Sequence, residues 1–152
     1  MPRDRTEPST ATDRFWLASG AVLAAVATAG SLWFSLGLGL VPCTLCWYQR
    51  ILMYPLVVVL GVAAVENHTT IWRTVVPLSV LGGVIAVYHS ILQVTTTSCT
   101  FAGPCAVVQW RAPMLGLTIP NLSLIAFVLV TMSVLAGSDV IDPAVSNSGS
   151  TS

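Results

Sequence analysis

The four cysteines of this 152-residue chain fall into two close pairs, Cys43 with Cys46 and Cys99 with Cys105. Each pair could close as a disulfide, and a dithiol can pass electrons to a nearby disulfide when its thiolate attacks one of the sulfurs. Two cysteines separated by two residues are typical of redox sites. The cysteines therefore predict electron transfer through sulfur, if the fold brings both pairs to one face.

Two other uses of the cysteines stay open on spacing alone. Cys43 with Cys46 could be a structural disulfide, and Cys99 with Cys105 could simply staple a loop in which Gly103 and Pro104 favour a turn. Four cysteines could also supply a tetrahedral zinc ligand set, although the second pair lacks the tight spacing of usual zinc ligands. We expect the redox role and no metal.

Cys43 and Cys46 are predicted to open a helix. Pro42 suits a helix start, because its missing N–H would have no partner in the first turn. The free N–H groups and the positive end of the helix dipole would then favour a thiolate on Cys46. Arg50 follows one turn later on the same helix face and adds a permanent positive charge, unless it only reaches out to lipid head groups. We predict catalytic roles for these two cysteines and Arg50.

The composition places the chain in a membrane. Hydrophobic residues make up 55% of the sequence and charged residues 8%, and the mean hydropathy is +0.82. A soluble domain needs a more polar exterior than this composition can provide. Six Arg or Lys residues balance six acids, so the clustered positive charge of a nucleic-acid-binding protein is absent. We expect membrane lipid, and no nucleic acid, as a partner.

Four apolar stretches are long enough to cross a bilayer, which takes roughly 20 residues of helix. No stretch alternates like a barrel strand, so we predict an all-α integral membrane protein with a four-helix bundle. Glycines within the stretches would let helices approach closely. The predicted spans are Phe15 to Leu36, Trp47 to Val65, Thr74 to Val94 and Leu115 to Ala136, and the glycines are Gly20, Gly30, Gly37, Gly61, Gly82 and Gly83.

Arginine placement predicts the orientation, because arginines in short loops favour the cytoplasmic side. Four arginines lie before the first span or between the second and third, and only Arg50 and Arg111 lie on the other side. Both termini should then be cytoplasmic and both short cysteine loops extracytoplasmic, in the compartment where disulfides persist. We expect disordered tails over 1–13 and 139–152 around a membrane redox domain over 14–138.

His89 is the one ionisable residue expected deep in the third span. Such residues are costly in a membrane and usually functional. Gln93 lies four residues later on the same helix face. The alternative is a histidine that only bonds to a neighbouring helix.

The chain resembles the DsbB/BdbC family of membrane thiol-disulfide oxidoreductases, most closely its short BdbC-type members. The segment from Val41 to Pro55, with its Cys-x-x-Cys-x-x-x-Arg pattern, carries most of this resemblance together with the second cysteine pair. Further matching segments are Gly30 to Ser35, Tyr88-His89, Leu92-Gln93, Gly103 to Cys105, Gln109-Trp110 and Leu117 to Pro120.

This resemblance implies a quinone-dependent enzyme of the cell membrane. A thioredoxin-fold partner like DsbA or BdbD would attack the Cys99–Cys105 disulfide at Cys99. Cys105 would then attack Cys43, and Cys46 would pass the electrons to ubiquinone or menaquinone. The resemblance places Cys46, Arg50 and His89 at the quinone. The loop between Cys99 and Cys105 is shorter than in long DsbB members, so Cys43 must lie nearby or the partner must descend to the membrane.

Two further functional classes are weighed against this one. A reductase of the vitamin K epoxide type also has a four-helix bundle and two cysteine pairs, but its Cys-x-x-Cys comes late in the chain. A membrane scaffold with two structural disulfides would perform no chemistry, and its disulfides would resist exchange with a partner.

Overall fold

The computed structural model describes residues 9–66, 68–95, 105, 107–113 and 116–138. Its main helices are α1 (Ser9–Leu32), α2 (Thr44–Glu66), α3 (Trp72–Thr95) and α4 (Ile119–Ala136). A π-helical turn, η1 (Trp33–Gly37), extends α1, and a 3-10 turn, η2 (Thr69–Ile71), precedes α3. All four long helices have the length and apolar composition of membrane spans. The predicted all-α bundle of four transmembrane helices is confirmed.

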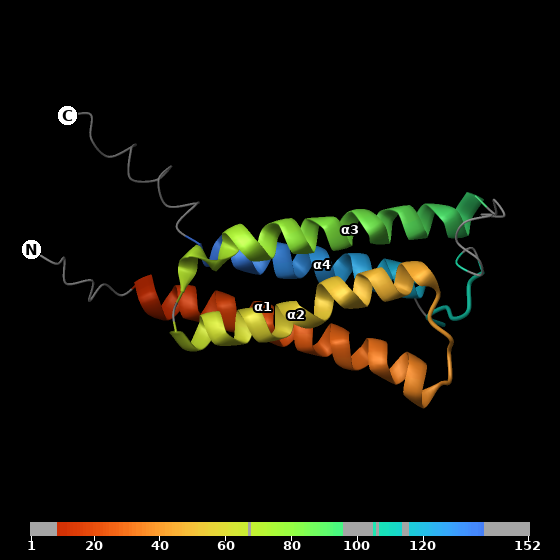
Figure 1. Cartoon of the computed structure of the whole chain (residues 1–152), viewed down its shortest axis with the longest axis horizontal. Coiled ribbons are helices and arrows are strands. Elements are labelled where there is room, and N and C mark those ends of the chain that lie inside the picture. Colours follow the sequence, from red (N-terminus) through yellow and green to blue (C-terminus); the bar gives the residue numbers. More distant parts are fainter. Residues whose placement is uncertain (1–8, 67, 96–104, 106, 114–115, 139–152) are drawn as a thin grey trace, which may run out of the picture.

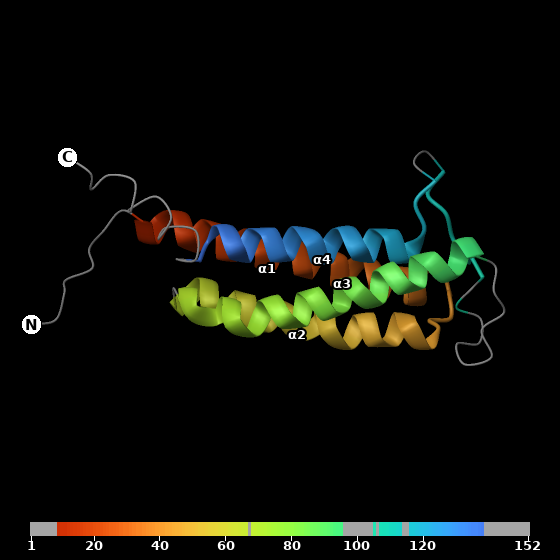
Figure 2. The ribbon, with the colours of Figure 1, turned by 90° about the horizontal axis from the view of Figure 1, so that it is seen from above.

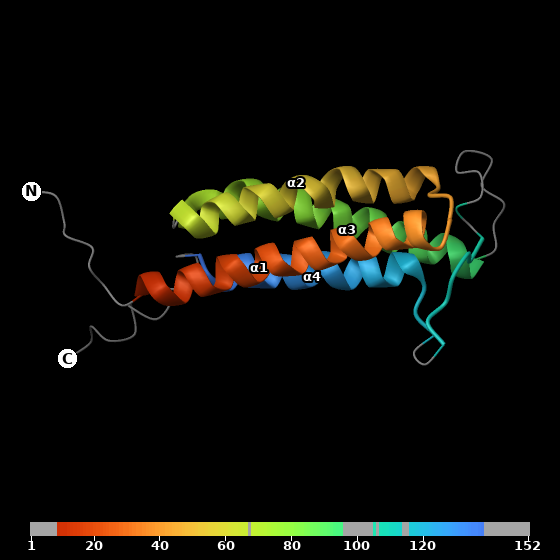
Figure 3. The same cartoon turned by 90° about the horizontal axis from the view of Figure 1, so that it is seen from below.

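The helices form a closed antiparallel bundle in which α1 packs against α2 and α4, and α3 packs against the same two. Figure 1 shows α3 and α4 on one side of the bundle and α1 and α2 on the other, and Figures 2 and 3, turned by 90°, show α1 beside α4 and α2 beside α3. The start of α1, the end of α4 and the α2–α3 connection share one end (Figure 1). Cys43 and Cys105 therefore lie at the opposite end.

The fourth helix begins at Ile119 rather than at the predicted Leu115. Arg111 pairs with Thr118 as an isolated antiparallel bridge, and Gly116 takes a left-handed φ of 65° between them. Backbone N–H and C=O groups of this turn bond to each other, so they are not available to a helix. Pro120 then suits the first helical turn. The apolar run after Arg111 is thus partly a loop.

The first helix begins at Ser9, inside the segment 1–13 that was predicted as a tail. Residues 1–8 and 139–152 lie outside the described residues, so the disordered tails and the domain limits stay predictions. The second helix begins at Thr44, three residues before the predicted span. This start places Cys46 in the first turn of α2.

The absence of a side chain at Gly82 lets α3 and α4 approach each other closely. A Cβ atom at Gly82 would lie 2.2 Å from Cζ of Phe127, which is fully buried in the core. A Cβ atom at Gly20 would lie 3.5 Å from Leu60, an ordinary packing distance. Gly30 and Gly61 have no described neighbour within 4 Å of a Cβ position, so the expected close approach is wrong for these two.

Replacing Gly82 with alanine should therefore destabilise the bundle. Because the Phe127 ring must move within a packed core, we expect Gly82→Ala to lower the free energy of unfolding by about 1–3 kcal/mol. Gly83→Ala is the matched control, since its nearest neighbour would be 3.9 Å from the new Cβ atom. Unfolding in mixed micelles measures both variants, and equal stability of the two would contradict this packing.

Candidate active site

Cys43 and Cys46 lie at the start of α2. The carbonyl of Cys43 accepts a hydrogen bond from the backbone N–H of Trp47, so Cys43 immediately precedes the helix. The Cys43 thiol is 3.2 Å from Sγ of Cys46 and donates a hydrogen bond to it. Cys43 is buried and Cys46 half-buried. Pro42 and the Cys-x-x-Cys spacing predict a helix start here. This helix start holds the two sulfurs side by side.

The second loop brings Cys105 to the same point. Sγ of Cys105 and Sγ of Cys43 lie within 4.8 Å of each other and of a ring nitrogen of His89. Cys105 is only 1% exposed. Cys99 lies outside the described residues, so its pairing with Cys105 stays a prediction. The sequence left open how Cys105 reaches Cys43, and in the structure the two sulfurs are already neighbours.

The pKa values of two of these thiols, Cys43 and Cys105, are raised. The hydrogen bond that Cys43 donates to Cys46, together with burial, raises the pKa of Cys43 from 9.0 to about 11. Burial, reinforced by a hydrogen bond with Cys43, raises the pKa of Cys105 to about 11. Both groups are therefore neutral thiols at pH 7 when the protein is reduced.

His89 connects three segments through its two ring nitrogens. Its Nε2 lies 3.2 Å from the carbonyl oxygen of Cys105, and its Nδ1 lies 3.3 Å from Nε2 of Gln49 on α2. A carbonyl oxygen can only accept, so Nε2 of His89 must carry the hydrogen. In the neutral ring Nδ1 then accepts from the Gln49 amide. His89 thus links α3 to α2 and to the second loop, and its Nε2 also lies 3.8 Å from Sγ of Cys43.

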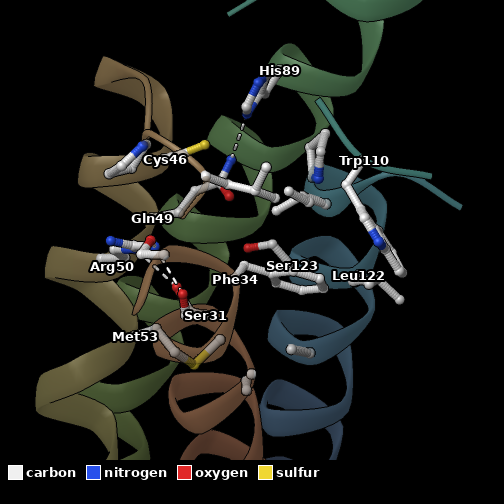
Figure 4. Close-up of a pocket in the computed structure, with 18 of the residues that line it drawn as sticks. Ser31, Phe34, Cys46, Gln49, Arg50, Met53, His89, Trp110, Leu122 and Ser123 are labelled. Atoms are coloured by element: carbon white, nitrogen blue, oxygen red, sulfur yellow. Dashed lines mark hydrogen bonds between the residues drawn. The ribbon is translucent and has the colours of Figure 1, made fainter. Parts of the chain in front are cut away.

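Arg50 ties α2 to the end of α1. Its Nε donates to Oγ of Ser31 at 2.8 Å, and one of its terminal nitrogens donates to the carbonyl of Ser31 at 2.9 Å and to the hydroxyl of Ser35. The guanidinium also lies 5.6 Å from the ring centre of Trp47. Arg50 therefore points into the bundle (Figure 4) rather than out to lipid head groups.

The two loops touch each other as well. Gln109 donates from its side chain to the carbonyl of Val41 at 3.0 Å, which joins the second loop to the first. The Trp110 ring packs on Phe34, with ring centres 4.8 Å apart. These contacts fix the segment after Cys105 against η1 and the first loop.

A cavity of about 350 Å³ lies beneath the loops. Cys46, Arg50 and His89 line it together with Phe34 and Trp110 (Figure 4). Its walls are mainly apolar side chains of α1, α2 and α4. The volume is within the range of about 300–1,000 Å³ that is usual for small-molecule sites.

Two polar atoms at this cavity have no partner among the described residues. The hydroxyl of Tyr54 and Oε1 of Gln93 are both buried and unpaired, and both residues line the cavity. A buried polar group without a partner costs about 1–3 kcal/mol, so such atoms commonly mark a ligand. The sequence pointed to Gln93 only through its spacing from His89, and it gave no signal for Tyr54 or for the Gln49 contact.

Comparison with known proteins identifies the family. The family model "Disulfide bond formation protein DsbB" matches residues 13–137. The chain is 40% identical over 116 residues to disulfide bond formation protein C of Bacillus subtilis, covering 72% of this chain and 82% of that protein. It is 39% identical over 123 residues to a probable disulfide formation protein of Deinococcus radiodurans, covering 72% and 79%.

The chain belongs to the DsbB family. A probable disulfide formation protein of Metapseudomonas resinovorans is 31% identical over 116 residues, covering 73% of this chain and 81% of that protein. No solved structure matches the chain. The resemblance to the DsbB family and its BdbC-type members is confirmed, and this DsbB-family protein is a multi-pass membrane oxidoreductase of disulfide bond formation.

The proximity of Cys43 and Cys105 in this DsbB-family protein can be tested by cross-linking. In a Cys46→Ser/Cys99→Ser double variant only these two cysteines remain. Since their sulfurs lie within 4.8 Å of each other, we expect mild oxidation to close a Cys43–Cys105 disulfide with near-complete loss of free thiol. Mass spectrometry of the intact protein and its peptides measures the bond.

The matched control is the Cys43→Ser/Cys99→Ser double variant, which keeps Cys46 and Cys105. Cys46 is outside the group of atoms that lie within 4.8 Å of one another, so this variant should oxidise several times more slowly. If the control closed as fast as the Cys43 variant, the local arrangement described above would be wrong.

Proposed function

We propose that this protein is a quinone-dependent thiol-disulfide oxidoreductase that reoxidises an extracytoplasmic thioredoxin-fold catalyst of the DsbA or BdbD kind. The observation that carries the proposal is the grouping of the sulfurs of Cys43, Cys46 and Cys105 beside an apolar cavity that Arg50 and His89 line. Two structural disulfides would need neither sulfurs grouped at one place nor a cavity beside them.

The first step takes place at the outer pair. A thiolate of the reduced partner attacks Cys99 of a Cys99–Cys105 disulfide, which breaks that bond and releases Cys105 as a thiolate. The partner's second thiol then displaces Cys99, so the partner leaves oxidised and the outer pair holds two electrons.

The second step passes the electrons inward. The Cys105 thiolate attacks Cys43 of the Cys43–Cys46 disulfide, so that a Cys43–Cys105 bond forms and Cys46 is released. Cys99 then attacks Cys105, which restores the outer disulfide and leaves Cys43 and Cys46 reduced. His89 holds the backbone of Cys105 in place through its carbonyl, and this keeps the attacking sulfur near Cys43.

The cavity has the properties of a quinone site. A quinone accepts two electrons and two protons when the inner dithiol closes again as a disulfide. Its ring is apolar and its two carbonyl oxygens accept hydrogen bonds, which fits an apolar cavity with the unpaired hydroxyl of Tyr54. Arg50 brings a positive charge close to Cys46, and His89 adds a second polar group at the same wall.

The orientation in the membrane is part of the proposal. The start of α1, the end of α4 and the α2–α3 connection lie at one end of the bundle, and Cys43 and Cys105 at the other. Arg14 and Arg73 belong to the first end, so the arginine bias supports a cytoplasmic location for it. The sulfur site would then face the oxidising side of the cell membrane, where a secreted partner can reach it.

The proposed function is tested by turnover of the purified protein. With a reduced thioredoxin-fold partner, we expect the wild type to reduce ubiquinone or menaquinone analogues and oxidise one partner dithiol per quinone, followed by absorbance and thiol titration. Because Cys46 is the proposed electron exit, Cys46→Ser should lower the rate by more than about 100-fold, as expected when an essential nucleophile is lost. Quinone reduction at the full rate in this variant would contradict the assignment.

Residues of the cavity wall can be tested through the dependence on quinone concentration. A single hydrogen bond contributes about 0.5–1.5 kcal/mol, so Tyr54→Phe should raise KM for the quinone by about 2- to 10-fold. Arg50→Ala should weaken quinone use further while exchange with the partner continues. Tyr88→Phe is the matched control, because Tyr88 is exposed on α3 and does not line the cavity. An equal effect of both tyrosine variants would argue against Tyr54 as a ligand.

A further inference from the structure

We propose that the reduced protein binds one soft divalent cation, such as Zn²⁺, between Cys43, Cys46, Cys105 and His89. This set gives three sulfur ligands and one imidazole nitrogen, a combination found in structural zinc sites. It differs from the four-cysteine set that the sequence raised as an alternative, since it includes His89 and leaves out Cys99. The inference does not depend on a quinone or a partner.

The distances between three of the four ligand atoms, those of Cys43, Cys105 and His89, are close to those that zinc requires, and Cys46 must move toward them. Zinc bonds of about 2.3 Å to sulfur and 2.0–2.1 Å to nitrogen give tetrahedral edges of about 3.6 Å between S and N and about 3.8 Å between two sulfurs. Sγ of Cys43 lies 3.8 Å from Nε2 of His89, and the sulfur of Cys105 lies within 4.8 Å of both residues. Shifts of about 1 Å or less would close this three-atom face.

Cys46 supplies the fourth ligand. Its sulfur is 3.2 Å from that of Cys43, and two cysteines separated by two residues commonly bind one zinc ion together. A zinc ion with three thiolates carries one net negative charge, which is costly near a membrane. Arg50 follows one turn after Cys46 and interacts with it electrostatically, so a compensating positive charge is already in place.

Gln49 can support His89 in both states. In the metal-free protein the Gln49 amide donates to Nδ1 of His89. When a metal occupies Nε2, the hydrogen must move to Nδ1, and the same amide can turn so that its oxygen accepts. A histidine ligand almost always donates its second N–H to such a partner. Gln49 is therefore a positioning residue for the metal-bound form.

Metal binding and the redox reaction exclude each other, because the same sulfurs serve both. A Cys43–Cys46 disulfide removes two of the four ligands. Conversely, a sulfur bound to the cation has its lone pair engaged, so closing a disulfide requires release of the cation. We therefore expect zinc to hold the protein in its reduced form until a chelator removes it.

Titration of the phosphine-reduced protein with Co²⁺ in detergent, without oxygen, tests the site. Tetrahedral Co²⁺ with thiolate ligands absorbs strongly in the visible and near-ultraviolet, and we expect one Co²⁺ per chain, displaced by Zn²⁺. Residues that only hydrogen-bond to a metal ligand are worth about 10- to 100-fold in metal affinity, so removal of a ligand itself by Cys43→Ser, Cys105→Ser or His89→Ala should weaken binding by more than about 100-fold. The oxidised wild type should not bind.

Matched controls separate loss of a ligand from loss of the fold. Cys99→Ser and His68→Ala, the second of which removes an exposed histidine at the α2–α3 connection, should bind Co²⁺ as the wild type does. Gln49→Leu should weaken binding by about 10- to 100-fold, whereas Gln49→Glu keeps an acceptor for His89 and should retain it. Unchanged Co²⁺ spectra in His89→Ala, or loss of binding in Cys99→Ser, would overturn the proposed ligand set, whatever the outcome of the quinone assay.

Discussion

The redox end of this bundle depends on the pair of hydrogen bonds made by His89. One bond goes to the side chain of Gln49 on α2 and the other to the backbone carbonyl of Cys105 in the second loop. Each bond contributes about 0.5–1.5 kcal/mol, but loss of a partner would strand a buried polar group at a cost of about 1–3 kcal/mol. The histidine thus fixes the distance between α2, α3 and the loop, and with it the distance between Cys43 and Cys105.

Arg50 plays the corresponding part between α2 and α1. A charged side chain this close to the apolar phase must have its donors satisfied, and Ser31 and Ser35 accept from it where α1 passes into its π-helical turn. The end of α1 diverges from α4 in Figure 1, and the cavity lies among these helices. The contacts that satisfy Arg50 therefore also position one wall of the cavity, next to the Cys46 sulfur that we propose as the electron exit.

Local features of the site could be predicted from the sequence, whereas its long-range contacts could not. Pro42 and the cysteine spacing predicted a helix start that the structure has at Thr44, because helix starts are encoded within a few residues. The end of the fourth span was predicted correctly at Ala136 but its start was not, since hydropathy does not distinguish the apolar loop before Ile119 from a helix. The approach of Cys105 to Cys43 depends on how α3 and the second loop pack, and no spacing in the chain encodes it.

The position of Tyr54 at the cavity could not be predicted from the sequence either. In the sequence it is one aromatic residue in an apolar helix, and such residues usually pack in a core or at a membrane interface. Only the fold reveals that its hydroxyl is buried at the cavity without a partner among the described residues. A lipid-facing tyrosine would reach the head groups or a neighbouring helix, whereas this hydroxyl has no partner among the described residues and is available to the proposed ligand. The wall that carries Cys46 and Arg50 thus combines a sulfur, a charge and an unpaired hydroxyl around one apolar space, and this combination supports the proposed redox site over two structural disulfides at the end of a bundle.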